Sequence, residues 1–483
     1  MSGAPNNLFT YDKPTCHNFS ENAHDALLDK NLQTQLSRIT REGFQQKRKN
    51  AMDRLDEFDI LRDRAKEIKS DVLKNLDAYL EIFEQNVIAA GGKVHWAASA
   101  NDAREIILKI CQDHNAKTVT KGKSMVSEEI GLNHYLEQHA IRAVETDLGE
   151  YILQLKNEPP SHIIAPAFHI AKSEVEDVFR QHHTNLDSGR DISEPKQLLN
   201  EAREILRDDF INADVGITGA NMLIAETGSA LIVTNEGNGD LTQSLPPVHI
   251  ALSSIEKIVP TLEDASTLLR VLARSATGQD ITVYTTFFTG PKRTPDLDGP
   301  KEFHLVLLDN GRSTTLGSEF SEALRCIRCG ACMNHCPVFG SVGGHAYGWV
   351  YPGPIGSVLT PLMVGMDEAH TLPDASTLCG RCEAVCPVRI PLPKLLRRHR
   401  VRSYDAGKQS LLAKIGLGAW VFVATKPKLY HSIAGFKVRA WKMFAGKRTR
   451  FSWLPFLGGW TDGRDFPAPT GKTFMDLWKQ KNK

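Results

Sequence analysis

The run Cys326-Ile-Arg-Cys329-Gly-Ala-Cys332-Met-Asn-His-Cys336-Pro337 decides how the C-terminal half of this chain folds. Its spacing, C-x2-C-x2-C-x3-C-P, is typical of thiolates that bind a [4Fe-4S] cluster and pass their fourth cysteine to a neighbouring cluster. A second run, Cys379-Gly-Arg-Cys382-Glu-Ala-Val-Cys386-Pro387, follows a spacer rich in glycine and proline. Together the two runs predict a pair of [4Fe-4S] clusters.

In the two-cluster pattern, each cluster is bound by cysteines from both runs. The second cluster is left one thiolate short, and aligning the second run on the first puts Ser376 at the missing position. Three alternatives stay open there: an iron exposed to water, substrate or a partner's ligand, Ser376 itself, or a ligand from elsewhere. The first cluster is predicted to take Cys326, Cys329, Cys332 and Cys386, and the second Cys336, Cys379 and Cys382. The candidates for a fourth ligand from outside the two runs are His335, His345, His370, Cys16 and Cys111.

Zinc and disulfides explain these cysteines less well. Tetrahedral zinc sites use two separated cysteine pairs, so the third and fourth cysteines of the first run and the following proline would be superfluous. Disulfides are typical of exported proteins, and residues 1 to 25 contain no basic segment followed by an apolar stretch. We therefore expect a cytoplasmic protein with reduced cysteines.

Length and composition limit the number of domains and the kinds of partner that can be expected. At 483 residues the chain is too long for one ordinary core, so two or three domains are expected. The formal net charge of +1 gives no overall field that would attract nucleic acid or membrane. No run of apolar residues is long enough to predict a membrane span.

From about Glu21 to Ala90 the chain is charged and helical in pattern. Apolar residues recur at steps of three and four, which predicts a stripe on one helix face that ends at Gly91-Gly92. The stripe suits a helix packed on its own domain or, alternatively, a docking helix for a partner. Its members are Leu55, Phe58, Leu61, Ala65, Ile68, Val72, Leu76, Leu80 and Phe83.

From Lys93 to about Arg312, strand patterns alternate with helix patterns. Such alternation predicts a mainly parallel sheet with helices on both faces, whose ligands lie beyond the carboxyl ends of the strands. The predicted strands begin at Lys93, Lys117, Ile141 and His162, the last in His162-Ile-Ile-Ala-Pro166, and the predicted helices cover residues 101–114 and 126–138.

Two places in this region are candidate sites. Lys121-Gly-Lys123-Ser-Met-Val-Ser127 follows a strand and opens a helix, which suits a phosphate or carboxylate, although the spacing is not that of a Walker A loop. Glu226 lies between two apolar strand patterns, where a carboxylate needs a function or a partner such as an arginine in a tight hairpin. Lys121, Lys123 and Glu226 are the candidate catalytic residues.

The chain becomes basic after the second cysteine run. Between Lys394 and Arg450 the one acidic residue is Asp405. Within this stretch residues 411–424 are apolar but too short to cross a bilayer. The stretch suits a membrane surface, a basic dock for an acidic redox partner, or a solvated face over a packed helix. No nucleic-acid motif accompanies the charge. The end of the chain, from Trp453 to Thr470, is expected to form an extended arm.

The chain resembles the lactate utilization protein B family over nearly its whole length. The marks of the resemblance are Lys121-Gly-Lys-Ser-Met-Val, Ala225-Glu-Thr-Gly228, Val306-Leu-Leu-Asp-Asn-Gly-Arg312, both cysteine runs, Tyr351-Pro-Gly-Pro-Ile-Gly356 and Trp460-Thr-Asp-Gly-Arg-Asp-Phe-Pro467. The resemblance implies an α/β LUD domain related to sugar-isomerase-like folds, a mostly helical ferredoxin-like domain with two clusters, and a family-specific C-terminal segment. We expect these parts at residues 93–312, 313–400 and 401–483, after an N-terminal helical segment at residues 1–92.

The same resemblance implies a role with two sister proteins, one cysteine-rich and one with a second LUD domain, in oxidising L-lactate to pyruvate. The chain contains no dinucleotide fingerprint, so we expect an oxidoreductase component that does not use nicotinamide. The main hypothesis is an electron-transfer subunit with a quinone-linked or peripheral membrane acceptor. The alternatives are a hydroxy-acid-binding subunit that uses the three-cysteine cluster as a Lewis acid, a scaffold, or the iron-sulfur subunit of another quinone- or disulfide-linked oxidoreductase.

Overall fold

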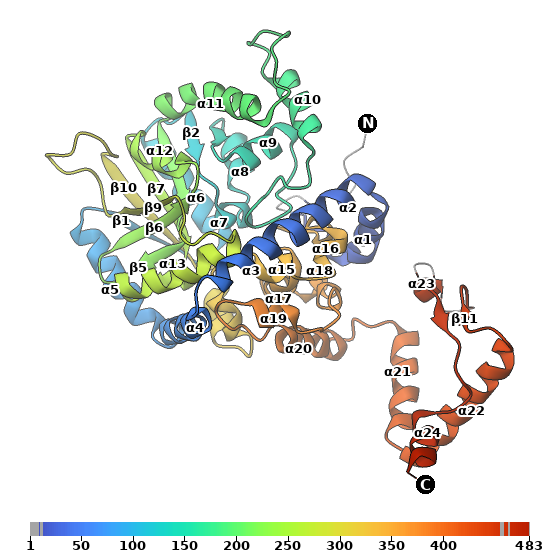
Figure 1. Cartoon of the computed structure of the whole chain (residues 1–483). Coiled ribbons are helices and arrows are strands. Elements are labelled where there is room, and N and C mark those ends of the chain that lie inside the picture. The colour runs from blue at the N-terminus through green and yellow to red at the C-terminus, as the bar shows by residue number, and fades with distance from the viewer. Residues whose placement is uncertain (1–8, 10–12, 455–457, 462–463, 483) are drawn as a thin grey trace. The chain divides into compact units, whose positions relative to one another are not determined.

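The computed structural model describes the whole chain except residues 1–8, 10–12, 455–457, 462–463 and 483 (Figure 1). The chain forms two compact units, Met1–Ser403 and Tyr404–Lys483, which are described separately. The finer boundaries expected at residues 92, 312 and 400 stay predictions.

The N-terminal part is helical and buries the apolar stripe that the sequence predicts. Phe58, Ala65, Val72 and Phe83 are at most 3% exposed, so the stripe packs within its own unit. After the last helix Gly91 adopts a left-handed conformation with φ of 90°. The elements are η1 (Cys16–Asn18), α1 (Phe19–Leu28), α2 (Lys30–Leu36), the π-helix η2 (Ser37–Gln45), α3 (Gln46–Asp53), α4 (Phe58–Lys74) and α5 (Leu76–Ala89).

Six parallel strands form the main sheet, in the order β1-β10-β7-β4-β2-β3 (Figure 1). Alternate residues of β10 face opposite sides: Val306 and Leu308 pack with α6, whereas Leu305 and Leu307 pack with α5. The predicted parallel sheet with helices is therefore confirmed. The strands are β1 (Lys93–Ala97), β2 (Thr118–Lys121), β3 (Arg142–Glu145), β4 (Val215–Gly219), β7 (Val248–Ser254) and β10 (Glu302–Leu308).

Helices connect these strands as the alternating pattern predicts. Ser99 begins α6 with a reciprocal capping box that includes Asp102. The predicted helix over residues 126–138 is divided into α7 and α8 by Gly131, which is left-handed. The helices are α6 (Ala100–Asp113), α7 (Met125–Glu129), α8 (Leu132–Gln138), α9 (Leu148–Lys156), α10 (Lys172–His182), α11 (Pro195–Asn212), α12 (Asn238–Ser244) and α13 (Leu262–Ala276).

The strand expected at His162–Pro166 is wrong. His162 accepts hydrogen bonds from the amides of Ile164 and Ala165 through its own Nδ1, at 2.9 and 3.0 Å. These amides are therefore used locally and are not available to a sheet.

The sequence pattern also missed a second, four-stranded sheet in the order β8-β5-β6-β9. Its strands are β5 (Met222–Ile224), β6 (Ser229–Thr234), β8 (Ile258–Val259) and β9 (Tyr284–Phe288), and η3 (Ile255–Lys257) precedes β8.

Short helices carry the cysteine runs. None of the described residues from 309 to 403 forms a strand, and a 3-10 helix at Ser321–Arg325 leads into the first run. The elements are α14 (Arg312–Leu316), η4 (Ser321–Arg325), α15 (Ala331–Asn334), α16 (Phe339–Val342), η5 (His345–Tyr347), α17 (Gly353–Met363), α18 (Met366–Ala369), η6 (Leu372–Asp374), α19 (Arg381–Val385) and α20 (Leu392–Asp405).

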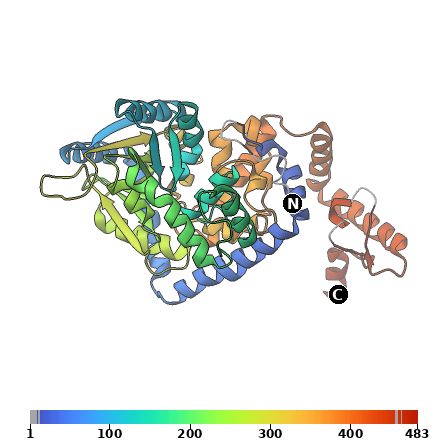
Figure 2. The ribbon, with the colours of Figure 1, turned by 90° about the horizontal axis from the view of Figure 1, so that it is seen from above.

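The N-terminal helices lie against this cysteine-bearing region although more than half of the sequence separates them (Figure 2). The Arg48 guanidinium donates to the Val385 carbonyl at 2.9 Å, and the Arg62 guanidinium donates to the Cys386 carbonyl at 2.9 Å. Gln45 donates to the Asn334 carbonyl at 2.7 Å. The two ends of the first unit are thus joined through buried side chains that hold main-chain oxygens.

The second unit exposes many apolar side chains. The helices α21 (Leu411–Ala424) and α24 (Phe474–Lys481) have no buried residue, and Trp420 is 61% exposed. Within the described part of the chain, no helix has the length and hydropathy to cross a bilayer. Of the expected extended arm, residues 455–457 and 462–463 lie outside the described residues, and the rest includes a short helix. The other elements are α22 (Pro427–Ala445), β11 (Arg450–Phe451), α23 (Gly458–Thr461) and β12 (Phe466–Pro467).

Candidate functional site

The two cysteine loops repeat one backbone conformation. Arg328 and Leu378, each just before a cysteine, are left-handed with φ of 58° and 53°, and the glycines after those cysteines have φ of 70° and 80°. The amide of Arg328 donates to Cys326 Sγ at 3.4 Å, and the amide of Leu378 donates to Ser376 Oγ at 3.1 Å. Ser376 therefore has the same local geometry as Cys326, in agreement with the sequence alignment of the two runs.

The thiols of the two runs influence one another in two sets. Burial and then the charges of Cys386 and Cys326 raise the pKa of Cys329 to about 12. Burial and then the charges of Cys336 and Cys379 raise the pKa of Cys382 to about 12. The pKa of Cys332 is raised by burial, by Cys326, Cys329 and Cys386, and also by Cys382, so the assignment of cysteines to clusters stays a prediction.

Tyr347 lies close to both sets. Its side chain is fully buried, and its hydroxyl has no hydrogen-bond partner among the described residues. Burial raises its pKa well above the usual value, and so do the charges of Cys336, Cys332 and Cys382. A residue influenced by thiols of both sets shows that the sets adjoin.

The spacing of the sulfurs is too wide for zinc. Sulfurs bound to one zinc ion at about 2.3 Å lie no more than about 4.6 Å apart. Among the described residues, the one group of three or more potential ligands whose donor atoms all lie within 4.8 Å of one another is His114, Glu302 and His304. Within the part of the chain that the structure describes, no three cysteine sulfurs form such a group, which fits thiolates that reach different irons of a larger cluster.

Backbone amides also fit an iron-sulfur cluster. The amide of Ile390 donates to Cys386 Sγ at 3.4 Å, as the amide of Arg328 does to Cys326. Amide donors to sulfur favour the thiolate form and are among the contacts that set a cluster's potential. Six of the seven cysteines are buried or half-buried, whereas Cys379 is exposed. The first set is thus more enclosed than the second.

The five outside candidates for the missing ligand all have other contacts. His335 donates from Nδ1 to the Ala331 carbonyl at 2.9 Å, and burial lowers its pKa to about 4. His345 and His370 also contact main-chain carbonyls, of Pro159 and Asp367. Cys16 donates to the Gly348 carbonyl, and Cys111 lies in the core beneath the main sheet. Ser376 is the one candidate within the repeated loop.

The Lys121 ammonium is bound by two carboxylates and one hydroxyl of the same chain. Its Nζ lies 2.8 Å from Glu128 and 2.7 Å from Glu145, and it donates to Ser127 Oγ at 2.8 Å. Burial lowers the pKa of Lys121, but the charges of Glu128 and Glu145 outweigh burial and raise it. The side chain is 1% exposed, so this lysine holds β2, β3 and α7 together and faces no ligand. Ser124 caps α7, and its side chain accepts a hydrogen bond from the amide of Ser127.

Glu226 lines neither of the two cavities described below. It lies in the exposed turn between β5 and β6, and its Oε2 accepts a hydrogen bond from the amide of Leu262 at the start of α13. Among the described residues it makes no ion pair, so the expected arginine partner is absent. Its carboxylate instead satisfies a free amide at a helix N-terminus.

Lys123, the third candidate, lines a cavity of about 350 Å³ at the carboxyl ends of the strands. The cavity lies between the sheets and the first cysteine loop, the position expected for ligands of open α/β sheets. Its polar lining includes Ser124, Asp147, Asn221, Glu236, Asn238, Lys257 and Arg328. The structure therefore brings one of the three predicted catalytic candidates into a cavity and leaves Lys121 and Glu226 outside it.

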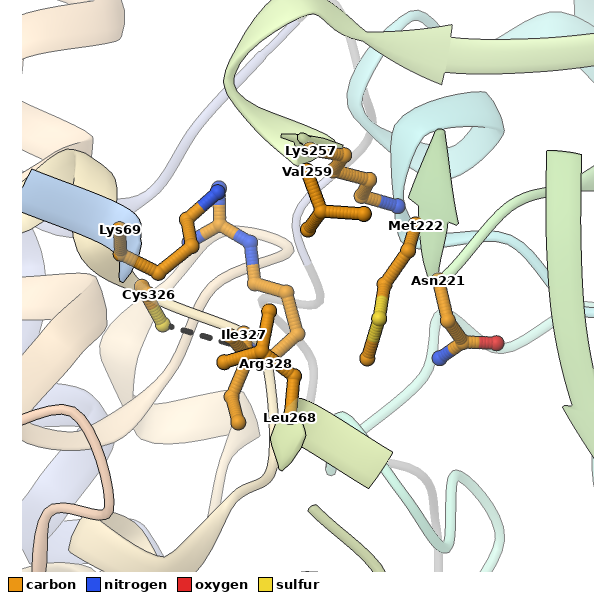
Figure 3. Close-up of a pocket in the computed structure, with 9 residues that line it drawn as sticks. All are labelled: Lys69, Asn221, Met222, Lys257, Val259, Leu268, Cys326, Ile327 and Arg328. Carbon is orange, nitrogen blue, oxygen red and sulfur yellow. Dashed lines mark hydrogen bonds between the residues drawn. The ribbon is translucent and has the colours of Figure 1, made fainter. Parts of the chain in front are cut away.

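A smaller pocket of about 20 Å³ connects this region to Cys326 (Figure 3). Lys69, Cys326 and Arg328 face Asn221, Met222 and Lys257 across it, and the amide nitrogen of Asn221 points inward. Asn221, Lys257 and Arg328 line both spaces. The larger cavity is thus adjacent to a predicted cluster ligand.

Glu256 joins the sheet to the first cysteine loop. Its carboxylate pairs with Arg312 Nε at 2.8 Å and with Arg328 Nη2 at 3.4 Å. Burial raises its pKa, but the charges of Arg312 and Arg328 outweigh burial and lower it to about 2. Arg312 also binds both oxygens of Glu129, at 2.9 and 2.7 Å.

Sequence reasoning missed Asn221, Glu256, Lys257 and Arg328 as site residues. The feature of the sequence that could have indicated them was the pair Glu256-Lys257, which follows a buried parallel strand at its carboxyl end. It also missed the group of His114, Glu302 and His304 at the start of β10. That group is satisfied within the chain, because Glu302 pairs with Lys93 and His304 contacts His95 at 3.0 Å.

Comparisons with known proteins match this arrangement. Residues 80–308 match the LUD domain, residues 322–390 the 4Fe-4S dicluster domain, and residues 381–483 the C-terminal domain of lactate utilization protein B. A solved DUF162 family protein from Deinococcus radiodurans aligns with a TM-score of 0.28 at 14% identity, over 48% of this chain and 98% of that one, which supports no argument.

Several curated proteins are similar over almost the full length. Lactate utilization protein B of Lysinibacillus sphaericus is 44% identical, with 96% of this chain and 98% of that protein covered. The protein of that name from Geobacillus thermodenitrificans is 44% identical over 94% and 96%. An Escherichia coli protein described as the uncharacterized electron transport protein YkgF is 43% identical over 90% of both chains. The chain belongs to the lactate utilization protein B family, with an LUD domain followed by an iron-sulfur domain.

Proposed function

We propose that this chain is the iron-sulfur electron-transfer subunit of a multi-protein system that oxidises L-lactate to pyruvate. The observation that carries the proposal is the adjacency of the two cysteine sets: Cys329 and Cys386 of the first and Cys336 and Cys382 of the second lie in one buried cluster with Tyr347. In this proposal Cys326, Cys329, Cys332 and Cys386 hold one [4Fe-4S] cluster, and Cys336, Cys379 and Cys382 hold a second, in a ferredoxin-like helical module. When bound, such clusters carry one electron at a time.

The surroundings of the cysteines support a relay with an inner and an outer end. Cys326 is half-buried and lines the small pocket beside the sheet domain. Cys379 is exposed, so the second set can meet another protein. We therefore infer that electrons enter near Cys326 and leave near Cys379.

The partners that we propose are the two sister proteins of lactate utilization, one cysteine-rich and one with a second LUD domain. The acceptor that we propose is quinone-linked or peripheral to the membrane. The exposed apolar helix α21 and the basic charge around it support a membrane-facing acceptor. The Lewis-acid alternative has less support, because the cavity adjoins the four-cysteine set and not the set that lacks a thiolate.

Anaerobic reconstitution with iron and sulfide tests the proposal. We expect about eight irons per chain in the wild type and EPR signals of two clusters after reduction with dithionite. Cys386→Ser should lose one cluster, so that the iron content falls to about half, whereas Cys111→Ser, a buried cysteine outside both sets, should bind iron like the wild type. A wild-type protein that binds zinc, or that yields no reducible cluster, would contradict the proposal.

A further inference from the structure

The helix α21 is apolar on every side, yet nothing in the second unit covers it. Lys414 is its one charged residue, and none of its residues is buried. Leu412 is 83% exposed and Trp420 is 61% exposed. A Cβ atom added at Gly416 or Gly418 would meet no neighbouring atom within 4 Å beyond the helix backbone. A helix that is apolar all round is the kind found inside a protein core or in lipid, so α21 needs a covering from outside the unit.

The rest of the second unit also exposes large apolar side chains. Phe436 and Phe444 of α22 and Phe474 of α24 are exposed. Five of the seven tryptophans of the chain lie in this unit, and each of the five is at least 37% exposed. Tryptophan combines an apolar ring with a hydrogen-bond donor and is enriched where membrane meets water. The five are Trp420, Trp441, Trp453, Trp460 and Trp478.

The same part of the chain carries charge of one sign. Residues 406–461 contain no Asp or Glu and ten Lys or Arg. Arg450 pairs with Asp465 of the following segment at 3.1 Å. Lys426 lies over the ring of Phe422 at 3.5 Å, so positive charge and apolar surface meet at the end of α21. The ten are Lys408, Lys414, Lys426, Lys428, Lys437, Arg439, Lys442, Lys447, Arg448 and Arg450.

The surface of an anionic bilayer matches both features at once. Its headgroups attract basic side chains, and its acyl chains can cover an apolar helix from several sides, whereas a protein partner covers one face. At a rise of about 1.5 Å per residue, the 14 residues of α21 span about 21 Å, less than the hydrocarbon core of about 30 Å. The helix can therefore enter one leaflet without crossing the bilayer.

We propose that the second unit binds the surface of a bilayer that contains anionic phospholipid. The helix α21 enters the headgroup layer with Trp420 and its other apolar side chains, and the surrounding lysines and arginines contact lipid phosphates. The inference deepens the membrane-facing acceptor of the proposed function and rests on that proposal for its purpose. The lipid contact itself depends on the second unit alone.

Flotation of the full-length, anaerobically reconstituted protein with vesicles tests this surface. The protein should bind vesicles that contain phosphatidylglycerol more tightly than vesicles of phosphatidylcholine alone, and high salt should weaken binding because it screens the charges. Lys428→Gln should weaken binding by about fivefold, since an exposed cation near the lipid is lost. Lys109→Gln, which removes an exposed lysine of α6 that pairs with Asp113, should bind like the wild type.

Trp420→Glu tests the apolar part of the surface. It removes a large apolar side chain and adds a charge that the lipid repels, so binding should fall by about tenfold or more. Because α21 has no buried residue, the exchange should leave the fold intact, which circular dichroism checks. Leu297→Glu, which changes a 92% exposed leucine of the first unit, is the matched control and should bind like the wild type.

Hydrogen exchange gives a second measurement that needs no variant. Vesicles with phosphatidylglycerol should slow exchange in α21 but not in α11 of the first unit, as followed by mass spectrometry. The proposal is overturned if the wild type does not float, if both kinds of vesicle bind equally, or if Trp420→Glu floats like the wild type. It is also overturned if protein concentration alone protects α21, because a second copy of the chain then covers the helix.

Iron content and reduction by dithionite are measured on the same preparation without vesicles. Failure of lipid binding therefore leaves the electron-transfer proposal intact, and a protein that floats without a reducible cluster separates the two in the other direction.

Discussion

Lys121 and Lys257 are both lysines at the carboxyl ends of parallel strands, but their surroundings differ. Lys121 contacts two carboxylates and a hydroxyl within 2.8 Å and is 1% exposed. Lys257 contacts a main-chain carbonyl and lines a cavity, and the charge of Glu256 acts on it against those of Arg328 and Arg312. Two carboxylates in direct contact raise the pKa of Lys121, whereas for Lys257 burial outweighs the charge of Glu256 and lowers the pKa.

The largest effect is expected for Lys121→Met. Removing this cation leaves Glu128 and Glu145 buried without their common partner, which should lower the free energy of unfolding by about 3–5 kcal/mol. The loss should shrink at low pH, where the two carboxyls can be protonated. Denaturant unfolding of the reconstituted protein measures the change, and Lys109→Met is the control. If Lys121→Met were as stable as the control, the assignment of Lys121 as a structural residue would fail.

A smaller effect of opposite character is expected for Lys257. Its pKa is about 8 in the folded protein and near 10.5 in the unfolded chain. Between these values the unfolded chain binds more protons, so the stability of the wild type should rise with pH, by up to about 3 kcal/mol from this group. The rise should be absent from Lys257→Met when both proteins are measured from pH 8 to 10. Parallel trends in the two proteins would contradict the comparison between Lys257 and Lys121.

The smallest effect is expected for Glu226→Gln. The amide oxygen of glutamine can still accept the hydrogen bond from Leu262, so what is lost is one negative charge near the start of α13. The free energy of unfolding should change by less than about 1 kcal/mol. Calorimetric melting measures the change. A loss of several kcal/mol would contradict the assignment of Glu226 to a helix N-terminus alone.

Predictions from the sequence succeeded where a structural feature depends on residues that are close together in the chain. Cysteine spacing predicted an iron-sulfur domain, and the alternating patterns predicted the strands that begin near Lys93, Lys117 and Ile141 because their periodicity depends on near neighbours. The pattern failed at His162, whose ring binds adjacent amides and prevents strand formation. Propensity and periodicity carry no information on such a local competition.

The site was predicted less well than the fold, for a physical reason. A lysine after a strand has the same sequence signature whether it meets carboxylates or a cavity. Glu145 reaches Lys121 through the pairing of β2 with β3, and Arg328 reaches Lys257 only when the cysteine loop packs on the sheet domain. Partners that are brought together by tertiary packing are not visible in a single sequence.

The contacts of Arg48 and Arg62 with the carbonyls of Val385 and Cys386 also constrain how the protein is made. The N-terminal helices leave the ribosome first, yet their acceptors are synthesised more than 300 residues later. These helices must therefore wait through most of translation with their apolar stripe incompletely covered. Because both predicted clusters take ligands from the second cysteine run, iron and sulfide can complete them only after that run is made, when its carbonyls also become available to the two arginines.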